Sequence, residues 1–157
     1  MRTATIHELK QELTNIPPAQ ITELCLRLAK FKKENKELLS YLLFEAHDEQ
    51  GYIDSVKKEM DEEFTGINRS NLYFAKKTIR KILRNTNKHI RYTSSKQAEI
   101  ELLIYFCTVL NKSGIKFHKS TALTNLYNNQ VKKIRTAIKT LHEDLQYDYI
   151  KELKQLE

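Results

Sequence analysis

Residues 102–110 read Leu-Leu-Ile-Tyr-Phe-Cys-Thr-Val-Leu, and this stretch decides the fold class. It belongs to a strongly apolar run without a charged residue, Leu102 to Asn111, which is about half the length that a membrane-spanning helix needs. A helix that is apolar on nearly every side is buried by neighbours on several sides. The sequence therefore predicts a buried central helix surrounded by other helices.

The composition of the 157-residue chain favours helices throughout. Only three Gly and two Pro occur, so the glycine turns on which all-β folds depend can be supplied rarely. A chain of this length buries roughly 68–70% of its surface and needs neither disulfides nor metal to fold. We predict an all-α fold, either a compact multi-helix bundle or a short helical-hairpin solenoid of about six to eight helices, in a single domain over residues 1–157.

Helix signals follow one another along the first third of the chain. Thr5 and Glu8 form a capping box that opens a helix to about residue 14. Pro18 suits the first turn of a second helix that ends near residue 33. We expect Asn35 to cap a third helix, and its segment Leu38–Ala46 is apolar nearly all round and therefore expected to be buried.

The remaining signals predict helices with stops at Gly66 and Gly114 and an interruption at Asn128-Asn129. The expected segments are Tyr52–Phe64 after a break at Asp48 and Gly51, a long helix from Asn68 or Ser70 to about Asn87, Ser95–Lys112 after a capping box of Ser94 and Gln97, Ser120–Tyr127, a helix from Val131 to Leu145, and Asp148–Leu156.

Two cysteines, Cys25 and Cys107, each lie within an apolar helical pattern. We interpret both as reduced thiols of the core, which is typical of a reducing compartment. No apolar signal-peptide region follows the N-terminus, so we expect a soluble, cytoplasmic protein without a membrane partner.

The net charge of +7 is distributed very unevenly. Residues 1–63 contain nine Lys and Arg against thirteen Asp and Glu, whereas residues 64–142 contain sixteen against two. Residues 143–157 are again acidic, with two Lys against five Asp and Glu. The sequence thus divides into an acidic N-terminal part, a basic part and an acidic tail.

The basic side chains of the long helix beginning near residue 68 share one arc of the helical wheel, opposite its apolar arc, and Tyr73 falls among them. A cationic helix face with an aromatic residue attracts a phosphate backbone. The candidate anion-binding or nucleic-acid-binding residues are Lys76, Lys77, Arg80, Lys81, Arg84, Lys88 and Arg91, joined on a later helix by Lys132, Arg135 and Lys139.

Two other interpretations of these cations stay open. They can form an ordinary solvated face, or be neutralised by the acidic segment 59–63 in an antiparallel hairpin, which would place the acids near Arg69, Lys76 and Lys77. A sharper version of the nucleic-acid hypothesis is a helix-turn-helix formed by Ser120–Tyr127, the Asn128-Asn129 turn and the following basic helix.

No catalytic motif occurs in the chain. Three isolated glycines cannot make a phosphate loop, and neither His7-Glu8 nor His142-Glu143 is followed by the second His of a zinc protease. The cluster of Glu45, His47, Asp48 and Glu49 is interpreted as a polar helix junction rather than a metal site, because consecutive helical residues point in different directions.

These observations favour a non-enzymatic helical protein-interaction module that needs no cofactor. We expect its basic half to bind an acidic protein partner or a second copy of the chain rather than nucleic acid. A nucleic-acid-binding protein that contacts phosphates through the basic helices is the main alternative, and an enzyme with a site assembled from distant residues is a third.

Overall fold

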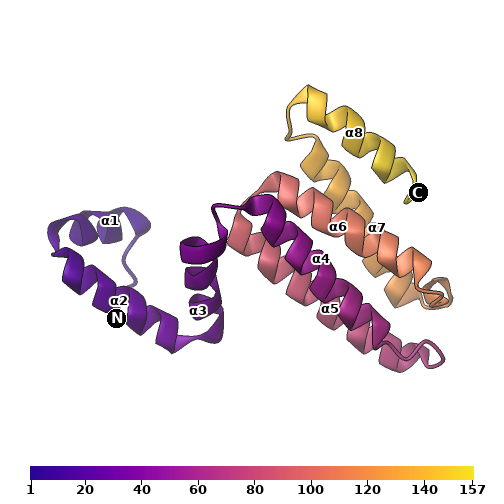
Figure 1. Cartoon of the computed structure of the whole chain (residues 1–157), viewed down its shortest axis with the longest axis horizontal. Helices are drawn as coiled ribbons and strands as arrows, with labels where there is room; N and C mark the ends of the chain where they lie inside the picture. The colour runs from indigo at the N-terminus through magenta and orange to yellow at the C-terminus, as the bar shows by residue number, and fades with distance from the viewer. The chain divides into compact units, whose positions relative to one another are not determined.

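The computed structural model describes residues 1–157 and contains eight α-helices and no strand (Figure 1). The all-α multi-helix fold predicted from the sequence is therefore confirmed. The helices are α1 (Ile6–Asn15), α2 (Pro18–Phe31), α3 (Lys33–Ser40), α4 (Glu49–Thr65), α5 (Leu72–Thr93), α6 (Lys96–Lys112), α7 (Thr121–Ile138) and α8 (Glu143–Lys154), with a π-helical turn at Tyr41–Glu45 and a 3-10 turn at Phe117–Lys119.

The chain separates into two compact units, an N-terminal unit (Met1–Phe44) and a C-terminal unit (Glu45–Glu157). The single domain expected from the chain length stays a prediction. None of the helices is long and apolar enough to cross a lipid bilayer.

Helix α6 is the centre of the C-terminal unit, where it packs against α4, α5, α7 and α8. Leu102, Leu103, Phe106, Cys107 and Leu110 are all fully buried. The predicted burial of the 102–110 segment is thus confirmed. Four helices surround α6 because its apolar side chains point in every radial direction and each direction needs a cover.

Helices α4 and α5 form an antiparallel hairpin whose boundaries differ from those expected. Asn71 caps α5 by accepting the backbone N–H groups of Tyr73 and Phe74, while Asn68 accepts those of Ser70 and Asn71 in the preceding turn. The predicted start at Asn68 or Ser70 is therefore wrong. The predicted end near Asn87 is also wrong, because the apolar spacing continues and α5 runs to Thr93.

Two adjacent serines form the junction between α5 and α6. Ser94 adopts a left-handed conformation with φ of 51° and ends α5, whereas the Ser95 side chain accepts the Ala98 N–H and begins α6. The expected capping box at Ser94 and Gln97 is therefore wrong, because the cap lies one residue later and Ala98, three positions after Ser95, has no polar side chain to complete a box. Gly114, with φ of 75°, follows the end of α6 as predicted.

Helix α7 continues without a break through Asn128 and Asn129, so both the predicted interruption and the helix-turn-helix are wrong. Leu123, Tyr127 and Ile134 keep the helical spacing across this point, and all three are buried. Each asparagine lowers helix propensity by less than about 1 kcal/mol, and the burial on either side outweighs that amount. The following helix, α8, starts at Glu143 rather than at 148, and α7 ends at Ile138 rather than near 145.

The N-terminal unit lacks the core that the sequence suggests. The Thr5–Glu8 capping box and the Pro18 start are confirmed, but α3 begins at Lys33, and the Asn35 side chain instead donates to the Leu28 carbonyl at 2.8 Å. No residue of α1, α2 or α3 is buried, and Cys25 is exposed rather than in a core.

The predicted burial of the Leu38–Ala46 segment is confirmed for Tyr41 and is wrong for the residues that follow it. Leu42, Leu43 and Phe44 are 56%, 63% and 67% exposed, and they lie in the π-helical turn rather than within a regular helix. An apolar segment indicates that its side chains need to be buried, but it does not show whether the same chain or another molecule buries them.

We predict that Gly51→Ala destabilises the protein by about 1 kcal/mol, the usual effect of losing a helix N-cap. The Asp48 side chain caps α4 by accepting the Gly51 N–H at 3.0 Å, and a Cβ at Gly51 would lie only 2.2 Å from Asp48 Oδ2. Urea denaturation measures the free energy of unfolding. Gly66→Ala is the matched control, because its φ is −81° and its Cβ would lie 3.8 Å from the nearest atom. Equal losses in both variants would contradict this account of Gly51.

Candidate anion-binding groove

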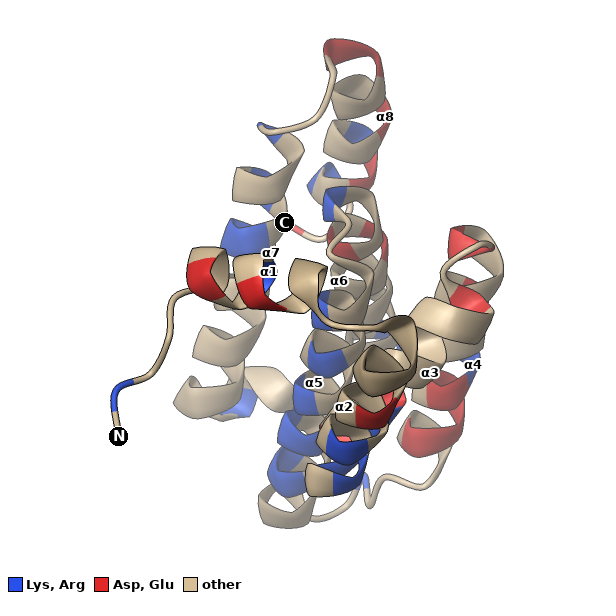
Figure 2. Cartoon of the chain, turned by 90° about the vertical axis from the view of Figure 1, so that its left-hand side faces the viewer, with Lys and Arg blue, Asp and Glu red and all other residues tan.

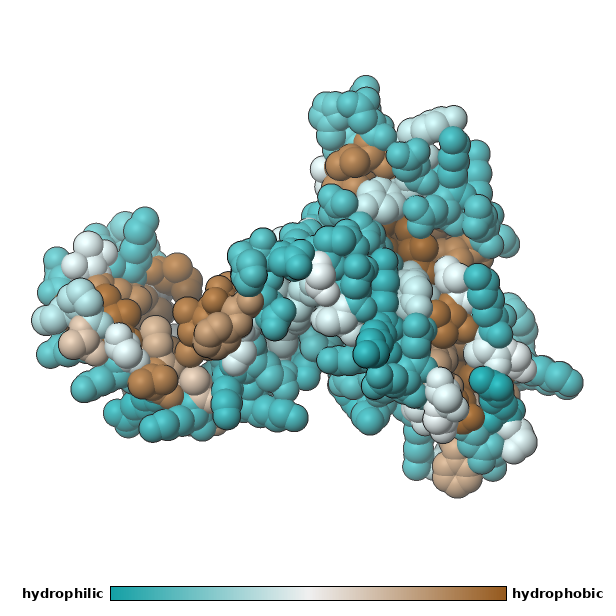
Figure 3. Space-filling model, viewed as in Figure 1, coloured by the Kyte–Doolittle hydropathy of each residue, from teal (hydrophilic) through white to brown (hydrophobic).

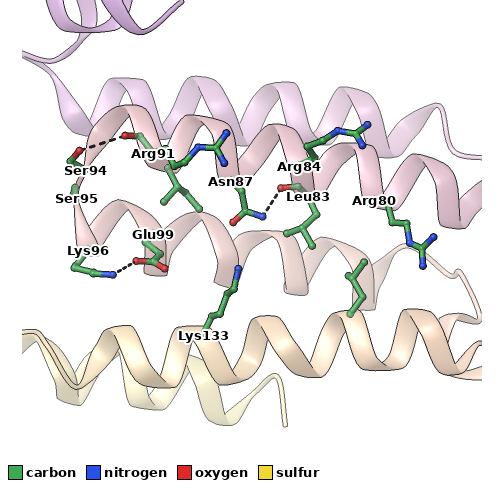
Figure 4. A pocket seen from close by; sticks show the side chains of 12 residues that line it. Arg80, Leu83, Arg84, Asn87, Arg91, Ser94, Ser95, Lys96, Glu99 and Lys133 are labelled. Atoms are coloured by element: carbon green, nitrogen blue, oxygen red, sulfur yellow. Dashed lines mark hydrogen bonds and ion pairs between the residues drawn. The ribbon is translucent and has the colours of Figure 1, made fainter. Parts of the chain in front are cut away.

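A groove of about 930 Å³ opens between α5, α6 and α7 (Figure 4). Three helices contribute positive side chains to its walls, and a single carboxylate, that of Glu99, lies among them. In Figure 4, Lys133 extends from α7 toward the other two helices. The five groove cations are Arg80, Arg84 and Arg91 from α5, Lys96 from the start of α6 and Lys133 from α7.

The one carboxylate neutralises only one of these cations. Glu99 Oε2 lies 2.7 Å from Lys96 Nζ, one turn away on the same helix. The other four groove cations are exposed to solvent and have no carboxylate oxygen within 4.0 Å. The groove therefore carries an excess of four positive charges that the molecule itself does not compensate.

The spacing of α5 explains why its three arginines meet on one wall. Residues 80, 84 and 91 are separated by four and seven positions, so they fall within about 40° of one another at 100° per residue. Leu83 and Ile90 lie beside them toward the core, and Leu126 of α7 completes an apolar floor. Cationic side chains thus border a partly apolar channel.

The acidic residues of α4 lie on the other flank of α5. In Figure 2, α4 carries red acidic residues where α5 carries blue basic ones. Glu63 is 3.6 Å from Lys81 Nζ and accepts from Asn85 Nδ2 at 3.2 Å, while Glu59 is 3.6 Å from His89 Nε2. The hairpin register expected from the sequence is therefore wrong, because these acids contact residues farther along α5 than Arg69, Lys76 and Lys77. The longer connection before α5 shifts the pairing.

Two predicted lysines lie with an aromatic residue at the start of α5. Tyr73 shares the helix stripe of the groove arginines and is 57% exposed. Lys77 Nζ lies 4.8 Å from the centre of its ring and Lys76 Nζ lies 6.0 Å from it, both within the range of cation–π attraction. The other two predicted lysines of α5, Lys81 and Lys88, lie on the flank that turns toward α4.

The candidates of the later helix are dispersed. Lys132 lines a cavity of about 290 Å³ that shares Lys96, Glu99 and Lys133 with the groove, so it borders the site. Arg135 instead pairs with Glu157, and Lys139 follows the end of α7 and does not line the groove. Of the ten predicted residues, the structure brings three together in the groove: Arg80, Arg84 and Arg91.

Sequence reasoning missed Lys96 and Lys133 as members of the same site. A helical wheel compares residues of one helix only, and these two lysines reach the groove from α6 and α7. The N-terminus of α6 also opens at this end of the groove, where the helix dipole adds positive potential. The serine cap at residue 95 was the available signal, since a helix start beside a cationic helix attracts anions.

Comparison of the chain with models of protein families, with curated proteins and with solved structures found no significant match.

A second cavity, of about 670 Å³ between α4, α6 and α8, has the opposite character. Its carboxylates outnumber its one cation, Lys57, which lies 3.4 Å from Glu101. Tyr149 donates to Glu101 at 3.0 Å, and burial together with that negative charge raises the pKa of Tyr149 to about 12. Burial and a hydrogen bond to Asp61 likewise raise the pKa of Tyr105 to about 12. Both phenols keep their protons at neutral pH, so these residues form a hydrogen-bonded, anionic wall.

Proposed function

We propose that the groove between α5, α6 and α7 binds the phosphate backbone of a nucleic acid, preferably single-stranded, in a non-enzymatic role. The observation that carries this proposal is the excess of four uncompensated positive charges on its walls. A polyanion gains by entering such a site because each neutralised phosphate releases counterions.

The arginine content of the wall supports phosphate as the ligand group. Three of the four uncompensated groove cations are arginines, whose planar guanidinium donates two parallel hydrogen bonds to phosphate. A surface that serves only solubility has no need of that geometry, and lysine fills most of the chain's other basic positions. The arginines are therefore concentrated where an oxyanion would be bound.

The length of the basic row also fits a nucleic-acid strand. From Lys76 to Arg91 the stripe covers sixteen residues, or about 22 Å of helix at roughly 1.5 Å per residue step. At the roughly 3.4 Å per nucleotide of a helically stacked strand, that length accommodates six or seven phosphates, and an extended strand places fewer along it. Several contacts of modest strength can then act on one ligand.

Tyr73 supports a single strand over a duplex and over an acidic protein. Its exposed ring continues the arginine stripe at the start of α5, so a strand bound along the arginines would pass over it. Bases that are free of a duplex stack on such a ring, whereas paired bases cannot reach it. An acidic peptide would use the cations but would have no bases to place there.

We predict that replacing Arg80, Arg84 and Arg91 together with Gln weakens binding of a labelled single-stranded oligonucleotide about 30-fold. Each exposed charge contact contributes roughly 0.7 kcal/mol of binding free energy, so three contacts contribute about 2.1 kcal/mol. Affinity changes about tenfold for each 1.4 kcal/mol. Fluorescence anisotropy at low salt measures the dissociation constant.

The matched control replaces Lys139, Lys151 and Lys154 with Gln. These three lysines are exposed and line none of the cavities described above, so both variants lose the same net charge. The control variant should bind within about twofold of the wild type. Equal weakening in both variants would mean that overall charge, and not the groove, attracts the strand. A wild-type protein that binds no strand at low salt would exclude the proposed function.

Tyr73→Trp provides a direct test of stacking, because the chain contains no other tryptophan. We predict that a single strand quenches the fluorescence of Trp at position 73 and that a duplex of the same sequence leaves it unchanged. Phe74→Trp is the control, since residue 74 is also exposed but points about 100° away around the helix. Tyr73→Ala should weaken only single-strand binding, by about 1–3 kcal/mol. Equal losses for strand and duplex would contradict the stacking role.

A competition experiment distinguishes a nucleic-acid ligand of the groove from an acidic protein partner. Polyglutamate offers carboxylates at regular intervals without bases or phosphates. If the proposal is correct, polyglutamate at equal charge concentration displaces the oligonucleotide poorly. Displacement as efficient as that by unlabelled oligonucleotide would favour an acidic protein as the ligand of the groove.

A further inference from the structure

The N-terminal unit exposes an apolar surface that its own helices do not cover. Figure 3 shows apolar residues gathered over this unit. Ten of its large apolar side chains are at least 40% exposed: Ile6, Leu9, Leu13, Leu24, Leu26, Leu28, Phe31, Leu42, Leu43 and Phe44. Isolated surface leucines are ordinary, but ten within 44 residues mark an interaction surface.

The spacing of these residues fits helix–helix packing. The apolar positions of α1 are 6, 9 and 13, followed by Ile16 just past its end, and those of α2 are 21, 24, 28 and 31. Both sets repeat the 3-4-3 spacing that forms one narrow stripe along a helix and packs against another helix. The two helices are joined only by Ile16 and Pro17, so the two stripes follow each other closely along the chain.

We infer that α1 and α2 pack against the same helices of a second copy of the chain, forming a symmetric dimer through the N-terminal units. A unit of 44 residues is close to the size below which oligomerisation is usually needed for folding. A two-fold arrangement would place the stripes of one copy on those of the other and make a four-helix contact.

The available area agrees with a second copy as the occupant. With roughly 150–200 Å² for each large apolar residue, the seven exposed apolar side chains of α1 and α2 present on the order of 700 Å². A stable interface buries about 800 Å² on each partner, so these side chains supply most of the area that a dimer needs.

The charges of the unit agree as well. It contains seven Lys and Arg against five Asp and Glu, so two copies meet with little net repulsion. The first helix is acidic, with Glu8 and Glu12 against Lys10, whereas basic residues such as Arg27 and Lys30 follow along α2. When a surface meets itself across a two-fold axis, acids of one copy can face cations of the other. A nucleic acid would find no comparable excess of charge here.

Sedimentation equilibrium of the full-length chain tests the dimer. The wild type should have twice the monomer mass of 18.6 kDa. Leu24→Glu with Leu28→Glu should return the mass to that of the monomer, because two buried carboxylates would lie at the interface. Leu145→Glu is the control: Leu145 of α8 is 41% exposed, close to the 43% of Leu24, and the variant should remain a dimer. A monomeric wild type, or a dimer that survives the double substitution, would overturn the inference.

Alkylation of Cys25 locates the interface without any substitution. Cys25 is exposed and lies beside Leu24 and Leu28 on α2, whereas Cys107 is buried in the other unit. In the wild type, the rate of Cys25 alkylation by iodoacetamide should fall as the protein concentration rises and the dimer covers α2. In the double-Glu variant the rate should not depend on concentration. A wild-type dimer whose Cys25 rate is independent of concentration would place the interface elsewhere and overturn the inference.

Discussion

The burial of α6 is the constraint on which the C-terminal unit depends. Its segment 102–110 presents apolar side chains in all radial directions, and α4, α5, α7 and α8 provide the covering surfaces. Each of these helices must then turn its own apolar stripe toward α6 and its polar side chains outward. The position of every surface charge in this unit follows from that arrangement.

The groove is one consequence of covering a central helix with separate helices. Where α5 and α7 flank the N-terminal half of α6, their outward side chains face each other across a channel. Arg80, Arg84 and Arg91 border it from one side and Lys133 from the other. The acids of α4 are held on the opposite flank of α5 by contacts with Lys81, Asn85 and His89, so they do not reach the channel. Separation of opposite charges onto two flanks of one helix creates the uncompensated field.

The helices could be predicted from the sequence more reliably than the contacts that each helix makes with the others. Burial of 102–110, the Thr5 cap and the Pro18 start were predictable because each depends on local spacing or local hydrogen bonds. The unbroken α7 was not, since packing of Tyr127 and Ile134 overrides two asparagines. The same limit explains the site: three of its arginines share one helix and were found together, whereas Lys96 and Lys133 meet them only through tertiary packing. The exposed residues Leu42 to Phe44 were predicted to lie in the core, because an apolar pattern does not show which part of the molecule, if any, packs against it.

The dependence of oligonucleotide affinity on salt tests the central claim most directly, because its slope counts neutralised phosphates. For a single strand each contact contributes about −0.7 to the slope of log K against log salt concentration, so the four uncompensated groove cations predict about −2.8. Replacing Arg80, Arg84 and Arg91 with Gln should reduce the magnitude of the slope by about 2. A slope near zero in the wild type, or one that the three substitutions leave unchanged, would contradict the account.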